Sequence, residues 1–347
     1  MSKILKATVV AITVLTTLTA CDPPIPQELL VAQAEQDVAC GSGDVSLLLE
    51  PAYADLGYSW AESALAACPE LVISEASDPE SATLIASADP VTVCEPIAKA
   101  PLAIDSAAVV FYLDEAFSLN LSPEVIAGIF DGSITEWTDP AITKLNTEIE
   151  FLEQPINVVT DAPASAISAM ANWINTDAGL STSLSLLTPA VDVYWSDVIM
   201  NLEPGSIALV PGSEALVNGA VPANIVLANG QTVLLDQGSL FGAASQFAFE
   251  QFDNEVIATY DITAEVSAFA GSSDAVEAYR AVYPIYLNMC GEDDLTVRAA
   301  ARYLVRLDAQ GLIATSTLVA LPESIRVASA ITLGMGLPQP TALPTEG

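Results

Sequence analysis

An alternation of short apolar runs with amphipathic segments predicts an α/β protein with a mostly parallel sheet. Residues 45–50 (VSLLLE) and 70–76 (ELVISEA) are rich in strand-forming residues, and residues 58–67 between them carry apolar side chains at helical spacing. Such a strand–helix–strand unit joins neighbouring parallel strands. Residues 101–113 (PLAIDSAAVVFYL) form a longer apolar run, which indicates a strand covered on both faces.

Capping residues mark where several helices begin. Ser77 with Pro79 in the first turn predicts a helix over 77–87, and a strand is expected at 91–96. Ser122 followed by Pro123 predicts a helix over 122–130 in the same way. The other predicted elements are strands at 155–161, 204–211 and 223–229, and helices at 58–67 (with Trp60 and Leu65 inward), 139–146, 163–174 and 295–314.

The charge of the chain excludes several classes of function. Its 347 residues include 44 acidic and 9 basic side chains and no histidine, which gives a net charge of −35 at pH 7. A field of that sign repels DNA, RNA and anionic lipid, so we expect no nucleic-acid partner. Without histidine a Ser-His-Asp triad is impossible, and the missing Cys-x-x-Cys spacing also argues against zinc. The acidity then reflects either solubility in a salty medium or a role in binding cations.

The N-terminus carries the pattern of an export signal. Residues 1–20 combine a basic start (MSKILK) with an apolar stretch too short to favour a membrane span. The ending Leu-Thr-Ala-Cys resembles the bacterial lipoprotein box, in which Cys21 becomes the lipidated first residue on the outer face of a membrane; the alternative is an ordinary cleaved signal with an incidental cysteine. We expect a tether over 21–40 and a disordered Pro/Thr-rich tail over 336–347.

Four further cysteines predict two disulfides in an exported chain, and they allow three pairings. We favour Cys40–Cys68, because both residues should lie at the same end of the first strand–helix–strand unit. That choice leaves Cys94 to pair with Cys290.

Two neighbouring segments resemble one protein family. SLNLSPEVIAGIFDGSITEWTDPAITKLN (118–146) and QPINVVTDAPASAISAMANWI (154–174) are similar to the phosphate-binding proteins of bacterial ABC importers, and YRAVYPIYLNMC (279–290) resembles a strand of the same family. The resemblance implies a periplasmic-binding-protein-like fold of two lobes, with a ligand cleft between them and a hinge on the crossing strands near 105–113 and 255–285. The implied lobes are 41–113 with 255–335, and 114–254.

The resemblance also implies a binding site on three loops. In the family these loops hold a desolvated phosphate with hydroxyl groups, backbone N–H groups and one arginine. The matching positions here are Glu50 after the first strand, Ser77 and Asp78 after the second, Asp161 where the arginine belongs, and the retained hydroxyls of Ser165 and Ser168. Two like charges about 4 Å apart repel by roughly 4 kcal/mol at an effective dielectric near 20. We therefore expect phosphate binding to be weakened or lost.

The functional expectation follows from this combination of scaffold and altered loops. The chain is expected to be a membrane-anchored, non-enzymatic solute-binding lipoprotein that works with an ABC permease and needs no cofactor or metal. The alternative is a binding-protein-like scaffold that serves as an interaction subunit of another extracytoplasmic membrane complex. The acidic loops suit a cation or a basic solute, or they merely solvate a vestigial cleft; the ligand stays open.

Overall fold

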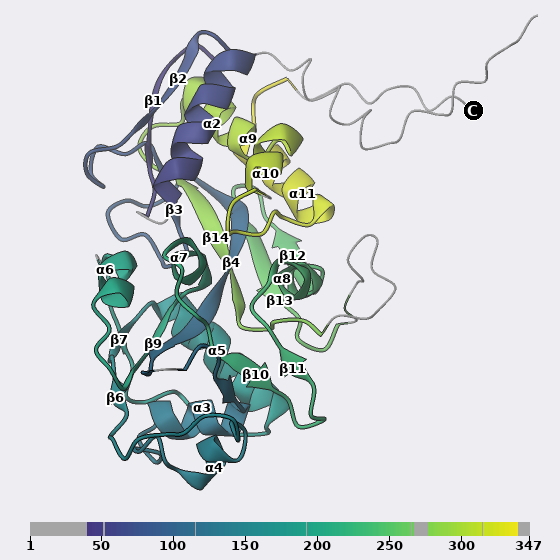
Figure 1. Ribbon diagram of the computed structural model, residues 1–347. Helices are drawn as coiled ribbons and strands as arrows, with labels where there is room; N and C mark the ends of the chain where they lie inside the picture. Colours follow the sequence, from purple (N-terminus) through teal and green to yellow (C-terminus); the bar gives the residue numbers. More distant parts are fainter. Residues whose placement is uncertain are drawn as a thin grey trace, which may run out of the picture.

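The computed structural model describes residues 40–50, 53–114, 116–191, 193–264, 266, 277–313 and 315–338. Figure 1 shows an elongated molecule with two lobes, one built around β1, β2 and α2 and the other around α3, α5 and β9. Two long strands, β4 (Ala98–Tyr112) and β14 (Val282–Met289), run from one lobe toward the other. The export signal and the lipidation predicted at Cys21 lie outside the described residues, as do nearly all of the predicted tether and tail.

One seven-stranded sheet passes through both lobes in the order β2-β1-β3-β14-β4-β9-β6. Strand β1 pairs in parallel with β2 and β3, and β9 pairs in parallel with β6. The antiparallel pairs of this sheet all involve the crossing strands β4 and β14. The predicted α/β class is confirmed. The remaining bounds in this sheet are β1 (Gly43–Leu48), β2 (Leu71–Glu75), β3 (Leu84–Ser87), β6 (Asn157–Val158) and β9 (Ser206–Pro211).

The first lobe is covered by α2 (Ala54–Ala67), α9 (Leu295–Leu304), α10 (Leu307–Ile313) and α11 (Glu323–Leu333). Trp60 on α2 is 1% exposed, and its indole N–H donates to the carbonyl of Ala309 at 3.1 Å. Leu65, which we expected to face the core, is 49% exposed because Trp60 and Ala64 define the buried face of the helix. The helix predicted over 295–314 is divided into α9 and α10.

Two sequence predictions in this lobe are wrong. Residues 77–87, expected as a helix, form a turn followed by β3, and the strand expected at 91–96 is not formed. The carboxylate of Asp78 accepts the backbone N–H of Ser81 at 2.9 Å, which closes the turn locally. The apolar residues of β3 then pair with β1 on one side and β14 on the other, so that sheet pairing overrides the helical signal.

The second lobe confirms the predicted capped helices. Ser122 accepts the N–H of Val125 at 3.3 Å at the start of α3 (Pro123–Phe130). Trp137 is fully buried, and its indole N–H donates to the carbonyl of Gly205 at 2.9 Å. The strand predicted at 155–161 is shorter than expected and is followed by β7 (Asp161–Ala162). The other helices of this lobe are α4 (Pro140–Thr143), α5 (Ala164–Asp177), α6 (Trp195–Met200) and α7 (Gly212–Val217).

Smaller sheets complete the fold. A three-stranded sheet has the order β11-β10-β5, and two-stranded sheets are formed by β12 with β13 and by β7 with β8. In Figure 1, β12, β13 and α8 lie beside the crossing strands. The bounds are β5 (Asn120–Leu121), β8 (Thr188–Pro189), β10 (Asn224–Val226), β11 (Thr232–Val233), α8 (Gln237–Ala244), β12 (Phe247–Gln251) and β13 (Val256–Tyr260).

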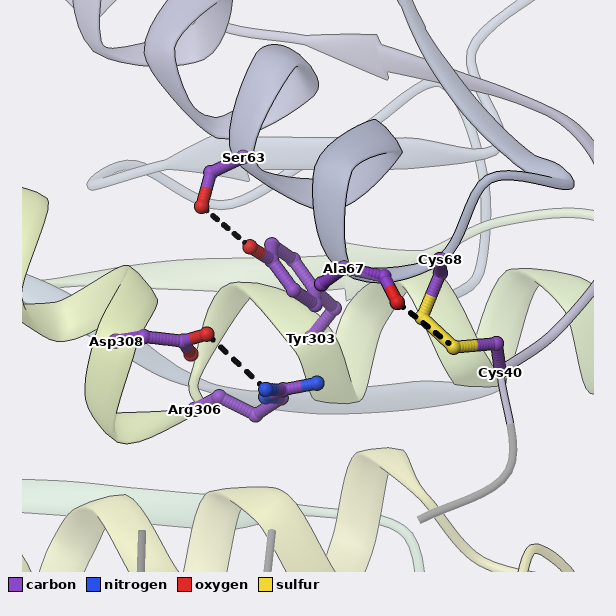
Figure 2. Close-up of a disulfide and its surroundings, with 7 residues drawn as sticks. All are labelled: Cys40, Ser63, Ala67, Cys68, Tyr303, Arg306 and Asp308. Atoms are coloured by element: carbon purple, nitrogen blue, oxygen red, sulfur yellow. Dashed lines mark hydrogen bonds and ion pairs between the residues drawn. A yellow bond between two sulfur atoms is a disulfide. The ribbon is translucent and has the colours of Figure 1, made fainter. Parts of the chain in front are cut away.

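Both favoured disulfides are present. Cys40 is bonded to Cys68 and Cys94 to Cys290, with Cα–Cα distances of 5.3 and 5.9 Å. Figure 2 shows the first bond at the C-terminal end of α2, which is also held to α9 by a 2.6 Å hydrogen bond between the hydroxyls of Ser63 and Tyr303. The second bond ties the segment between β3 and β4 to the end of β14.

Candidate functional site between the lobes

A buried aspartate forms the centre of the candidate site. Asp105 lies on the crossing strand β4 and is 2% exposed. Its Oδ1 accepts the backbone N–H of Ser213 at 3.0 Å, and its Oδ2 accepts the Ser213 hydroxyl at 2.6 Å. The hydroxyl of Tyr53 donates to the same Oδ2 at 2.7 Å. Asp105 thus links α7 of the second lobe to the start of α2 in the first.

The approach of α7 to β4 depends on a glycine. A Cβ placed on Gly212 would lie 2.0 Å from the side-chain oxygen of Ser106 and 3.2 Å from its backbone carbonyl oxygen. Such contacts are shorter than van der Waals packing allows, so any larger residue would push α7 away from the strand. Gly212 therefore lets the next residue, Ser213, place both of its donors on Asp105.

A second carboxylate joins the lobes at another point. Asp89 follows β3, and its Oδ1 accepts the backbone N–H of Ser165 at 2.9 Å. Ser165 lies in the first turn of α5, where backbone N–H groups have no partner within the helix. Asp89 is half-buried and supplies from the first lobe the negative charge that this helix start favours.

Four carboxylates come close enough to influence one another, and we call Glu50, Asp89, Asp105 and Glu214 the carboxylate cluster. Burial, and after it the negative charges of Asp105 and Asp89, raise the pKa of Glu50 to about 7, although the hydrogen bond from the Ala88 N–H lowers it. Burial also raises the pKa of Asp105, although hydrogen bonds from Ser213 and Tyr53 lower it. The groups acting on Glu50 include no basic side chain. The cluster therefore gathers acidic side chains whose burial and mutual repulsion favour the protonated form of Glu50.

Burial and the nearby charge of Asp105 also raise the pKa of a third carboxyl group and of two phenol groups near the cluster. Glu214 is 3% exposed and accepts the amide N–H of Asn218 at 2.8 Å; burial raises its pKa. Burial and the charge of Asp105 raise the pKa of Tyr53 and Tyr283 well above their ordinary values. Both phenols therefore stay neutral, and Tyr53 uses its proton in the hydrogen bond to Asp105.

The structure brings together only part of the predicted site. Glu50 lies in the carboxylate cluster, and Ser165 binds Asp89 within it. Ser168 and Ser165 line a partly open cavity of about 430 Å³ beside Tyr283.

The other predicted site residues lie elsewhere. Ser77 and Asp78 are exposed and bond to each other at 3.0 Å in their own turn. Asp161 is exposed at the start of β7. Their part in ligand binding stays a prediction.

Sequence reasoning missed Asp89, Asp105, Tyr53 and Ser213. One signal was available: Asp105 is a lone charged residue inside the apolar run 101–113, where an ionisable group is rare unless it has partners. Asp89 was hidden because β3 was predicted as a helix.

Metal binding finds no support in this cluster. Within the part of the chain that the structure describes, no group of three or more His, Cys, Asp or Glu side chains is arranged to hold a metal ion. Three of the four carboxylates, Asp89, Asp105 and Glu214, accept hydrogen bonds from N–H or hydroxyl donors of the chain.

The chain has two lobes joined by crossing strands, with polar groups converging between them. This fold is similar to that of phosphate-binding proteins of ABC transporters. A structure from Clostridium perfringens, assigned as a phosphate ABC transporter substrate-binding protein with bound phosphate, has a TM-score of 0.51 at 11% identity and covers 81% of this chain and 100% of its own. A high affinity periplasmic phosphate-binding protein, PfluDING, has a TM-score of 0.52 at 14% identity, covering 82% and 92%.

The sequence similarity is local. Phosphate-binding protein PstS 3 of Mycobacterium leprae is 41% identical over 59 residues, which is 17% of this chain and 16% of that relative. The chain therefore matches about a sixth of the length of this curated relative. No family model matches the chain.

Proposed function

We propose that this protein is a non-enzymatic, extracytoplasmic solute-binding protein whose affinity for phosphate is weak or lost. The fold shared with phosphate-binding proteins supports the first half of the proposal. The carboxylate cluster supports the second half, and it is the single observation on which the proposal depends.

Electrostatics argue against a phosphate dianion between these lobes. Each carboxylate about 4 Å from a phosphate charge would oppose binding by roughly 4 kcal/mol at an effective dielectric near 20. Three donors that could offset this repulsion are already used, since the N–H and the hydroxyl of Ser213 bind Asp105 and the backbone N–H of Ser165 binds Asp89. The Asp161 position, at which the family resemblance implies an arginine, adds another acidic group.

A neutral or basic solute fits the site better than an anion. Glu50, with its pKa near 7, can donate a proton or carry a charge at neutral pH. Ser165 and Ser168 offer hydroxyl groups at the adjoining cavity. We therefore assign ligand contact to Glu50, Ser165 and Ser168.

The location and partner belong to the same proposal. Two disulfides are typical of a chain that folds outside the cytoplasm. We place the protein on the outer face of the cell membrane, anchored by lipid on Cys21 and delivering its solute to an ABC permease. Among the described residues, no helix has both the length and the apolar character needed to cross a membrane.

A second candidate function is an interaction subunit of another extracytoplasmic membrane complex. It is favoured by one observation, namely that the interlobe donors of Ser165 and Ser213 already have partners within the chain. Purification from the native membrane separates the two candidates. A co-purifying permease and ATPase supports solute import, and a different complex supports the interaction role.

Calorimetric titration of phosphate into the protein at neutral pH tests the loss of phosphate binding. We expect no heat of binding from protein whose circular dichroism shows it to be folded. Micromolar or tighter phosphate binding would contradict the proposal, and abolition of that binding by Ser165→Ala would show that the family's site is intact.

A further inference from the structure

We propose that the lobes are held closed without solute by the chain's own carboxylates, Asp89 and Asp105. These two side chains accept hydrogen bonds from Ser165 and Ser213, which lie in the other lobe. The inference goes beyond the proposed function, because it concerns the state of the empty protein and holds whichever solute or partner the protein serves.

The first contact is the bridge at Asp105. The carboxylate is buried on a crossing strand and receives donors from both lobes, Tyr53 from the start of α2 and Ser213 from α7. Tyr53 is 4% exposed and Ser213 is fully buried. Separating the lobes at this point would break the two hydrogen bonds from Ser213, and any of these groups that stayed buried would be left without a partner, which opposes opening.

The second contact is the bridge between Asp89 and Ser165. It joins the segment after β3 to the first turn of the 14-residue helix α5, and these elements belong to different lobes. The Cys94–Cys290 disulfide ties the segment that carries Asp89 to the end of β14. Asp89 is therefore presented from a covalently held segment, so that the bridge does not depend on ordering a free loop.

These bridges alter the usual cycle of a two-lobed binding protein. In a hinged protein, solute normally supplies the contacts that make the closed state favourable. Here charge-assisted hydrogen bonds within the chain supply those contacts instead. A solute would have to displace Asp89 or Asp105 from its donors before it could use them.

Amide hydrogen exchange in phosphate-free buffer measures this directly. Ser165 lies in the first turn of α5, so its N–H would exchange freely if the lobes were open. In the intact wild-type chain we expect its exchange to be slowed by about tenfold or more relative to an unstructured amide. Free exchange at Ser165 in the folded, solute-free protein would overturn the proposal.

Variants separate closure from local packing. Asp89→Ala removes the acceptor and should speed exchange at Ser165 by about tenfold, whereas Asp89→Asn keeps an acceptor oxygen and should preserve most of the protection. Asp78→Ala, the same change in an exposed turn, is the matched control and should leave Ser165 as in the wild type. An Asp89→Ala protein with unchanged exchange at Ser165 would overturn the proposal.

A variant remote from Ser165 tests whether the two bridges act together. Ser213→Ala removes only the hydroxyl that donates to Asp105 from the second lobe. Because opening would break both bridges, this change should speed exchange at Ser165 several-fold although it leaves Asp89 untouched. Exchange at Ser165 that is indifferent to Ser213→Ala would show that the lobes are not closed by a shared set of contacts.

Discussion

The segment 122–146 and the carboxylate cluster both bury polar atoms, but they do so in different ways. In segment 122–146, Ser122 and Asp139 cap the helices that follow them, and Trp137 needs a single carbonyl partner. In the carboxylate cluster, Asp105 needs donors that come from positions 52 and 108 residues away. The resemblance to phosphate-binding proteins is thus strong in the packing of segment 122–146. Between the lobes, carboxylates lie where the resemblance implies hydroxyl groups, backbone N–H groups and an arginine.

The largest expected effect lies in segment 122–146. Trp137 is fully buried, and it packs in parallel with Phe151 at a centroid distance of 6.4 Å. Trp137→Ala should lower the free energy of unfolding by about 3–5 kcal/mol, because it leaves a cavity and removes the indole hydrogen bond to the Gly205 carbonyl, which keeps only its bond from the Asn157 N–H. Urea denaturation measures the change. Phe117→Ala, at a site that is 88% exposed, is the control and should change stability by less than about 0.5 kcal/mol. A similar loss for both variants would mean that this segment does not anchor the lobe.

The two disulfides should differ in strength. The Cys94–Cys290 bond closes a loop with a sequence separation of 196, compared with 28 for Cys40–Cys68. In the chain-entropy account the longer loop contributes more, so replacing Cys94 and Cys290 by alanine should cost about 1–2 kcal/mol more than replacing Cys40 and Cys68. Parallel urea denaturation of the two double variants tests this order. Equal losses would show that the loop lengths do not control the difference.

The carboxylate cluster should show itself in the pH dependence of stability. The pKa of Glu50 is about 7 in the folded protein, above its ordinary value of 4.5, so the folded state holds the proton more tightly than the unfolded state. Its favourable contribution is full below pH 4.5 and is lost as pH rises through about 7. The contribution amounts to about 3 kcal/mol.

Glu50→Gln tests whether Glu50 makes the folded protein less stable as the pH rises. The variant should lack the decline in stability between pH 4.5 and 7 that Glu50 adds to the wild type, as measured by urea denaturation across that range. Glu62→Gln on the exposed face of α2 controls for the loss of one acidic residue. An unchanged slope in Glu50→Gln would mean that Glu50 is not protonated in the folded state near neutral pH.

The smallest effect is expected at Asp161. Asp161→Arg reverses the charge at the position where the family resemblance implies an arginine, yet the site is exposed and Ser165 remains bound to Asp89. We expect phosphate affinity to change by no more than about fivefold, as for other exposed charges. Calorimetry is the measurement, and tight phosphate binding by this variant would mean that one charge, and not the occupied donors, excludes the anion.

The sequence was sufficient for features determined by neighbours along the chain. The cap at Ser122, the buried Trp60 and the long strand β4 all follow from local patterns. The class of fold followed as well, because strand–helix alternation leaves few ways to cover a sheet. The disulfide pairing could be argued from the same topology.

The candidate site was only partly predictable, for a physical reason. Asp89, Asp105 and Ser213 become partners of other segments only after β3, β4 and α7 are assembled, and no local pattern specifies that convergence. The resemblance places the second loop of the site directly after the second strand, at Ser77 and Asp78. In the structure the carboxylate that reaches the other lobe is Asp89, which follows β3, one strand later. Leu84 and Ile85 pair with β1, and this pairing stabilises a strand where helix propensity predicts a helix.

Small-angle X-ray scattering with and without saturating phosphate is the most direct test of the central claim, that the chain's own carboxylates close the lobes and exclude the anion. We predict a closed, compact particle in phosphate-free buffer and a superimposable curve after phosphate is added. A phosphate-free particle that is more extended, and that contracts when phosphate is added, would contradict the account.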